Sequence, residues 1–289
     1  MKQRYVCRIS GEKLTLSLYS LRRAMRDKLL LKLGFQSLFR DNVSSFYFHA
    51  LNRQTNLAER RCGPPSVNYY EFGVGLGGTL INYIKALRKF CKRSKKELYS
   101  YHIFAFDSFN GLPKKKSPKD DYKEWYEGCY SHSLSEIKQR VIKQGIDLRQ
   151  GTVHLIKGFY EKTLTPELRN ELKDYPPSIV TIDCDYYSST KTVLEWLRPM
   201  LVSGTLFYFD DIWSFHGNPH YGELAAINEF NKAEEGQLTP IPLFGLSSKI
   251  FIYSRREFEF TRENQDDREL NVEIVDSSTT SLQRKSIYA

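Results

Sequence analysis

The sequence predicts an α/β protein built on a mostly parallel β-sheet with helices on both faces. Strand-like and helix-like segments alternate through the central part of the chain, and a glycine-rich turn joins the first strand to its helix. Acidic residues follow four of the five strands that precede a helix. Alternation of this kind favours parallel pairing, because each helix returns the chain to the same end of the sheet.

The first unit is a strand through Glu71, a glycine turn, and a helix over residues 79–90. Glycine lets the backbone approach a ligand closely and permits positive φ. Gly73, Gly75 and Gly78 match the dinucleotide pattern G-x-G-x-x-G. The turn matches equally the acidic-x-G-x-G-x-G loop of S-adenosylmethionine (SAM) methyltransferases, with Glu71, Gly73, Gly75 and Gly77. A purely structural turn is the third interpretation, so the turn alone leaves the cofactor open.

The remaining units follow in order along the chain. Strands are predicted at 102–106, 152–156, 178–182 and 204–209, and helices at 133–144, 165–173, 189–201 and 222–234. Segments 238–246 and 249–253 close the series as an antiparallel pair. Together these elements predict a Rossmann-like, doubly wound, seven-stranded sheet.

The chain divides into three predicted regions. Residues 1–64 form an N-terminal helical extension, because apolar residues recur at helical spacing across 15–40 with basic residues between them. Residues 65–254 form the cofactor-binding domain. Residues 255–289 form a polar tail that we expect to be flexible.

Composition is typical of a globular cytoplasmic protein. The chain is 40% hydrophobic and 14% aromatic, enough for a substantial core. It has no apolar run of about 18 residues that could cross a membrane, and its N-terminus lacks the apolar stretch of a signal peptide. Five scattered cysteines without a C-x-x-C pair indicate reduced thiols. We therefore expect a cytoplasmic location and no membrane partner.

The formal net charge of +9 raises the question of nucleic-acid binding. Much of the basic charge lies in two stretches, 85–96 and 114–119. Such stretches bind phosphate in some proteins, and in others they are solvated helix ends. No RNA-binding motif with interleaved aromatic residues accompanies them, so we do not expect a nucleic acid as the partner.

The candidate site lies at the carboxyl ends of the strands, where ligands bind in such sheets. Asp107 follows the second strand, at the position of an acceptor for ribose hydroxyls. NAD enzymes and SAM enzymes share this feature, and a turn-capping aspartate is the alternative. His216 and His220 follow the fifth strand, where either an auxiliary base or a substrate contact is possible, as is a solvent-facing loop.

Two pairs of aspartates follow strands four and five, which we expect to be neighbours. Asp183, Asp185, Asp210 and Asp211 would then converge, repel one another and raise one another's pKa values. A divalent cation would relieve this repulsion. Oxygen ligands alone favour Mg²⁺, with Mn²⁺ or Ca²⁺ as alternatives, over zinc. Loop capping with salt bridges is the alternative interpretation.

A metal beside a carboxylate suits the methylation of an alcohol. A hydroxyl group of pKa roughly 15.7 is far too weak an acid for a free aspartate of pKa about 3.9 to deprotonate completely. Coordination lowers the pKa of the hydroxyl, and an adjacent carboxylate then takes the proton during attack.

With these residues in place, the chain resembles the macrocin O-methyltransferase family of class I SAM-dependent methyltransferases, which act on sugar hydroxyls of natural products. The resemblance covers roughly residues 68–235. It rests on four segments in the same order, which are Glu71 to Gly78, Phe106-Asp107-Ser108-Phe109-Asn110-Gly111-Leu112-Pro113, Lys157-Gly158-Phe159 with Thr163-Leu164, and Ile182-Asp183-Cys184-Asp185-Tyr186-Tyr187-Ser188-Ser189-Thr190 leading into Phe209-Asp210-Asp211.

The resemblance implies a SAM-dependent, Mg²⁺-assisted O-methyltransferase with a small sugar or glycoside as acceptor, and leaves a homo-oligomer possible. Asp183, Asp210 and Asp211 match the magnesium ligands of the family, and Asp185 matches its general base. The implied cofactor-binding residues are Glu71, Gly73, Gly75, Gly77, Asp107 and Ser108. The family's N-terminal helices help to cover the site, a role open to residues 15–60. Ile212 and Trp213 depart from the Tyr-Gly that often follows the paired aspartates, and the loop to Gly222 is longer and aromatic.

Three other functions compete with this interpretation. An NAD-dependent oxidoreductase explains the glycine turn and Asp107 but leaves the aspartate pairs without a role. A nucleic-acid methyltransferase fits the charge, but the Asp/Asn-Pro-Pro-aromatic motif of amino-methylating enzymes is absent after strand four. A non-catalytic methyltransferase-like binding module would have no need to keep four crowded acids.

Overall fold

The computed structural model describes residues 4–9, 12–17, 43–241 and 249–256. Near the N-terminus, β1 (Arg4–Ile9) pairs antiparallel with β2 (Glu12–Ser17). Residues 15–17 thus belong to a strand and not to the predicted helix over 15–40. The rest of that helix, and the tail at 257–289, lie outside the described residues.

Seven strands form one sheet in the order β5-β4-β3-β6-β7-β9-β8. They are β3 (Asn68–Phe72), β4 (His102–Asp107), β5 (Val153–Lys157), β6 (Ile179–Ile182), β7 (Leu206–Phe209), β8 (Gly236–Pro240) and β9 (Ile250–Arg255). The first five of these in chain order are parallel, and β9 pairs antiparallel with both β7 and β8. The predicted seven-stranded, mostly parallel sheet is therefore confirmed. The chain reverses direction across the sheet between β3 and β6, the type of position at which doubly wound sheets bind ligands.

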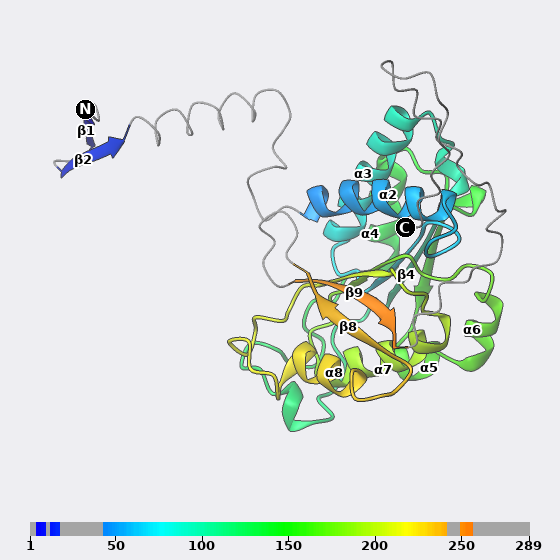
Figure 1. Ribbon diagram of the computed structural model, residues 1–289. Coiled ribbons are helices and arrows are strands. Elements are labelled where there is room, and N and C mark those ends of the chain that lie inside the picture. The colour runs from blue at the N-terminus through cyan, green and yellow to red at the C-terminus, as the bar shows by residue number, and fades with distance from the viewer. Residues whose placement is uncertain (1–3, 10–11, 18–42, 242–248, 257–289) are drawn as a thin grey trace, which may run out of the picture. The chain divides into compact units, whose positions relative to one another are not determined.

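Helices cover both faces of the sheet (Figure 1). One face carries α2 (Val43–Glu59), α3 (Gly78–Ser94) and α4 (Leu134–Lys143). The other carries α5 (Tyr160–Thr163), α6 (Pro166–Glu171), α7 (Tyr187–Leu197) and α8 (Gly222–Phe230). None of the described helices is both long and apolar enough to cross a membrane.

Local sequence explains where several helices begin. Ser133 accepts a hydrogen bond from the backbone of Glu136, whose side chain accepts in return, a capping box that starts α4 at the predicted place. Thr165 caps α6, and Pro166 occupies its first turn, where no amide hydrogen is needed. Each capping residue lies within four residues of the start of its helix, so these helix starts can be predicted from the local sequence alone.

Aromatic side chains dominate the core on both faces of the central strand β3. On the α2 and α3 face, the rings of Tyr69 and Tyr83 stack with centroids 3.8 Å apart. On the opposite face, the rings of Phe72 and Phe106 stack at 4.7 Å. Every residue of β3 is buried, so the strand that leads into the glycine turn is held firmly from both sides.

Candidate active site

The glycine turn after β3 runs close against the end of β6. A Cβ atom added to Gly73 would lie 1.7 Å from the carbonyl oxygen of Asp183, and the φ of Gly73 is +89°. Only glycine fits at this crossing of two neighbouring strand ends. At Gly75, with a φ of +49°, an added Cβ would meet nothing within 4 Å. The turn therefore packs tightly on one side and leaves open space on the other.

Asp107 ends β4, and its side chain binds the backbone of the glycine turn. Its Oδ2 accepts hydrogen bonds from the amides of Val74 at 2.7 Å and Gly75 at 2.9 Å. Its Oδ1 accepts one from the amide of Phe109 at 2.6 Å. The hydroxyl of the next residue, Ser108, donates to the carbonyl oxygen of Gly111 at 2.7 Å. Asp107 thus organises two loops at once, which is the turn-capping role that the sequence leaves open.

Four aspartates follow β6 and β7, which are adjacent parallel strands. Ile182 lies opposite Phe209 in the register, so Asp183 and Asp210 leave the sheet side by side. The amide of Asp210 donates to the carbonyl oxygen of Ile182 at 3.0 Å. Asp185 has a φ of +60°, a left-handed conformation that residues with a side chain adopt at a cost. The structure brings the four residues together as the strand ends require.

The carboxylates of this cluster raise one another's pKa values. Burial, followed by the charges of Asp211 and Asp210, raises the pKa of Asp183 well above its ordinary value. Burial, followed by the charges of Asp211 and Asp210, also raises the pKa of Asp185, to about 8. Burial and Asp210 raise the pKa of Asp211 to about 6, against a lowering effect of Lys249. Each charged form is disfavoured because like charges lie together away from water.

Few partners within the protein compensate this negative charge. Lys249 donates to Asp210 Oδ1 at 2.9 Å, and the Tyr208 hydroxyl donates to the same oxygen at 2.8 Å. Ser214 donates to Asp211 Oδ1 at 3.3 Å, whereas Asp211 Oδ2 is buried without a partner. No group of three His, Cys, Asp or Glu side chains in the described part of the chain has the spacing of a preformed metal site. The metal assignment stays a prediction.

A pocket of about 430 Å³ joins the glycine turn to the carboxylate cluster. Pockets of roughly 300–1,000 Å³ are the usual size for small ligands. The predicted site residues that line it are Gly73, Gly75, Asp107, Ser108, Asp183, Asp185, Asp210 and Asp211. Further lining residues come from the segments after β4 and β5, among them Leu112, Tyr130, Phe159 and Tyr160. One cavity therefore holds the groups expected for a cofactor and those expected for the reaction.

The model of the Macrocin-O-methyltransferase (TylF) family matches residues 66–240, well over half of the chain. The chain belongs to this family. It is therefore an O-methyltransferase that uses SAM.

Two solved methyltransferase structures are similar to this chain. CalS11, described as a calicheamicin methyltransferase, has a TM-score of 0.55 at 20% identity, covering 85% of this chain and 95% of its own. The O-methyltransferase NovP has a TM-score of 0.45 at 18% identity, covering 71% of this chain and 79% of its own. No curated protein sequence gives a significant match. At these identities the likeness to CalS11 shows the fold.

Glu71 and Gly77, two of the predicted cofactor-binding residues, are not among the residues that line the pocket. Glu71 is fully buried and accepts a hydrogen bond from the Tyr69 hydroxyl at 2.6 Å. Burial raises the pKa of Glu71 to about 8. Gly77 has a φ of +75° at the N-cap of α3. Glu71 lies in the strand before the turn, and Gly77 lies at the start of the helix after it.

Glu223 belongs to the carboxylate cluster, although no sequence pattern assigned it a role. Its Oε2 accepts a hydrogen bond from the amide of Asp211 at 2.9 Å, and its Oε1 is buried without a partner. Burial, followed by Asp211 and Asp183, raises its pKa well above the ordinary value. The signal available in the sequence is an acidic residue in the first turn of a predicted helix, a position that usually faces solvent.

His216 and His220 are not among the residues that line the pocket. The backbone amide of His220 donates to Asn218 Oδ1 at 3.0 Å, which stabilises the loop before α8.

The basic stretch at 114–119 forms ion pairs within the protein. Lys115 pairs with Asp121 at 2.7 Å, and Lys119 pairs with Glu229 at 2.5 Å. Part of its charge is therefore used within the protein.

Proposed function

We propose that this O-methyltransferase methylates a hydroxyl group of a sugar or another polyhydroxylated small molecule, with assistance from Mg²⁺. The observation that carries the proposal is the single pocket lined by both the glycine turn and the four aspartates. Membership of the macrocin-O-methyltransferase family supports a sugar-bearing acceptor. A carboxylate cluster at the cofactor site suits a hydroxyl nucleophile, which must lose a proton as it attacks.

The cofactor is proposed to bind along the glycine turn. Open space above Gly75 allows a ligand to approach the backbone closely. Asp107 Oδ1 accepts a short hydrogen bond from the amide of Phe109 and a long one, at 3.5 Å, from the Ser108 hydroxyl. That hydroxyl donates over the shorter distance of 2.7 Å to Gly111, so Oδ1 has room for a closer donor. A ribose hydroxyl is the donor we assign to it. Ser108, beside it in the pocket, completes this end of the site.

Asp183, Asp210 and Asp211 are proposed to hold the magnesium ion. The donor set fits, because all three offer carboxylate oxygens, and Asp211 Oδ2 is buried with no other partner. Lys249 pairs with Asp210, and Asp183 and Asp211 form no ion pair within the described residues. A bound Mg²⁺ would lower the pKa of a hydroxyl group that reached it.

Asp185 is proposed to accept the proton of the acceptor hydroxyl. Asp185 lines the same pocket and is not among the three residues assigned to the ion, so its carboxylate is available to take the proton. As the proton leaves, the hydroxyl oxygen forms a bond to the methyl carbon while the sulfur–carbon bond of SAM breaks. S-adenosylhomocysteine leaves with the electron pair of that bond. The protein contributes positioning and proton transfer.

A methyl-transfer assay tests the proposed function. The purified chain is incubated with methyl-labelled SAM and a panel of methyl and aryl pyranosides, with Mg²⁺ or with EDTA. We expect transfer that requires both a glycoside and the metal. Asp185→Asn should lower kcat by about 10²-fold or more while SAM affinity is retained. Asp121→Asn, which removes an exposed carboxylate, is the control. Transfer that survives both EDTA and Asp185→Asn would contradict the mechanism, and transfer to none of the glycosides would contradict the acceptor class.

A further inference from the structure

The segment between β4 and α4, residues 108–133, forms one wall of the pocket and is called the wall segment here. Residues near its two ends line the pocket, namely Ser108, Gly111, Leu112, Pro113, Cys129, Tyr130 and His132. Between Asn110 and Tyr130, the buried side chains are those of Asp120 and Trp125. A carboxylate with no exposed surface in a largely exposed segment requires compensating hydrogen bonds.

Three backbone amides supply the hydrogen bonds of Asp120. Its Oδ2 accepts from Lys116 at 3.0 Å and from Ser117 at 2.9 Å. These bonds close the short turn η3 (Pro118–Asp120) on itself. Its Oδ1 accepts from the amide of Ser188 at 2.8 Å, a residue 68 positions further along the chain. Asp120 thus joins the wall segment to the start of α7.

The start of α7 has no capping side chain of its own. Tyr186 is its N-cap residue and accepts no hydrogen bond from the helix through its side chain. Ser188 is the second residue of the helix, where an amide hydrogen lacks a partner within the helix. Asp120 fills this gap, and its negative charge interacts favourably with the N-terminal end of the helix dipole.

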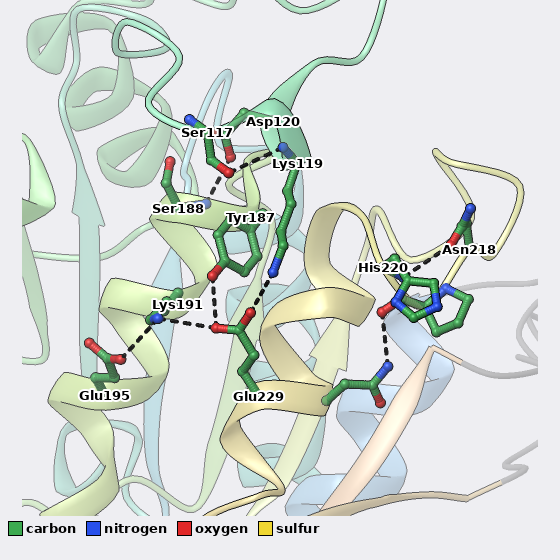
Figure 2. Close-up of polar contacts among 12 residues, drawn as sticks. Ser117, Lys119, Asp120, Tyr187, Ser188, Lys191, Glu195, Asn218, His220 and Glu229 are labelled. Carbon is green, nitrogen blue, oxygen red and sulfur yellow. Dashed lines mark hydrogen bonds and ion pairs between the residues drawn. The ribbon is translucent and has the colours of Figure 1, made fainter.

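Two other residues of the wall segment contact the same turn of α7. Lys119 Nζ lies 4.4 Å from the centroid of the Tyr187 ring and donates to Glu229 of α8 (Figure 2). The ring of Trp125 lies 6.0 Å from that of Tyr186. Three consecutive residues directly after Asp185, 186–188, are therefore contacted by the wall segment, through Trp125, Lys119 and Asp120.

We propose that Asp120 is a positioning residue for the active site. A left-handed aspartate such as Asp185 keeps its conformation only when the surrounding structure holds it. By fixing the start of α7 to the wall segment, Asp120 holds the turn from Asp183 to Asp185 and the opposite wall of the pocket in one arrangement. This inference rests on the proposed function, because it assumes that SAM and the reacting groups occupy this pocket.

Calorimetric titration of SAM into three variants tests the role of Asp120. Asp120→Ala removes all three hydrogen bonds, and we expect SAM affinity to fall about tenfold or more because the pocket loses its preorganised shape. Asp120→Asn keeps one acceptor oxygen and should give an intermediate affinity. Asp121→Asn, whose side chain is 76% exposed and pairs with Lys115, should change affinity by less than about twofold. Measurement well below each melting temperature separates binding from unfolding.

Amide hydrogen exchange supplies a local readout on the same proteins. In Asp120→Ala, exchange should speed up at Ser188 and along 111–112 and 128–132, while β3 and α3 stay protected. Retention of SAM affinity within about twofold in Asp120→Ala, whatever its melting temperature, would overturn the proposal and leave Asp120 a stabiliser of the fold. If Asp120→Ala does not fold, Asp120→Asn decides by the same criterion. Wild-type protein that binds SAM but methylates no glycoside would refute the proposed acceptor and leave this inference standing.

Discussion

Individual carboxylates around the pocket differ in how the protein stabilises them. Asp107 and Asp120 bind backbone amides, and Asp210 pairs with Lys249. Asp211, Glu223 and Glu71 each keep one buried oxygen with no partner. Buried polar groups without partners cost free energy, and among these three residues Asp211 is the one that lines the pocket. A ligand that supplies positive charge or hydrogen-bond donors would remove that cost.

Glu71 makes the stability of the protein depend on pH. Its pKa is about 8 in the folded protein, compared with an ordinary value of 4.5. Between these values the unfolded chain releases the proton and the folded protein retains it. The unfolded state therefore binds fewer protons, and the free energy of unfolding falls as the pH rises from 4.5 to about 8.

Glu71→Gln should remove this dependence, because glutamine cannot ionise and still accepts the hydrogen bond of Tyr69. Urea unfolding of both proteins at about pH 5 and about pH 8 measures the effect. Between these values the variant should gain up to roughly 4 kcal/mol relative to the wild type, from 1.36 kcal/mol per pH unit. If the free energies of unfolding of the variant and the wild type differed by the same amount at both pH values, Glu71 would be ionised in the folded protein throughout this range.

The aspartates that line the pocket could be predicted from the sequence at the level of single residues. Asp107, Asp183 and Asp210 follow strands directly, and ligands of parallel sheets gather at those ends. The left-handed conformation of Asp185 and the buried position of Glu223 could not be predicted. Both depend on contacts between segments distant in the chain, in the case of Glu223 with an amide 12 residues earlier.

At the scale of elements, α2 is joined to the sheet by a buried network of hydroxyl groups. The Tyr47 hydroxyl lies 2.8 Å from Thr181 Oγ1 on β6 and 3.0 Å from the Tyr69 hydroxyl on β3. Tyr69 continues the network to Glu71, beneath the glycine turn. Helix α2 is therefore tied to the strand ends that carry the site.

A double-mutant cycle of Tyr47→Phe and Thr181→Val tests this connection. Each single variant should lower the free energy of unfolding by about 1 kcal/mol, because each removes the hydrogen bond between α2 and β6, while the remaining hydroxyl keeps its contact with the Tyr69 hydroxyl at 3.0 Å. The double variant should cost less than the sum by about 1 kcal/mol, since both partners are then apolar. Urea unfolding measures all four proteins, and strictly additive losses would show that the two hydroxyls do not interact.

The helices with local signals were the easiest elements to predict. The capping box at Ser133 placed α4 correctly, and the glycine turn placed α3. The helix α2 and the single-turn α5 were not predicted as separate elements. No side chain caps the start of α5. Their positions follow from packing against the sheet, which local patterns do not contain.

For the whole molecule, the alternation of strands and helices predicted the parallel sheet and the adjacency of β6 and β7. The full strand order, with β3 between β4 and β6, depends on pairings across more than one hundred residues in the chain. That order places the glycine turn, Asp107 and the aspartate pairs around one pocket. We propose that SAM binds in this pocket.

Calorimetric titration of SAM and, separately, of NAD into the purified chain tests this claim most directly, with Asp107→Ala as the site-specific variant. We predict that SAM binds with one molecule per chain and that NAD gives no binding heat. Asp107→Ala should weaken SAM binding about tenfold or more, because both its hydroxyl acceptor and its support of the glycine turn are lost. Binding of NAD, or SAM binding that Asp107→Ala leaves unchanged, would contradict the account.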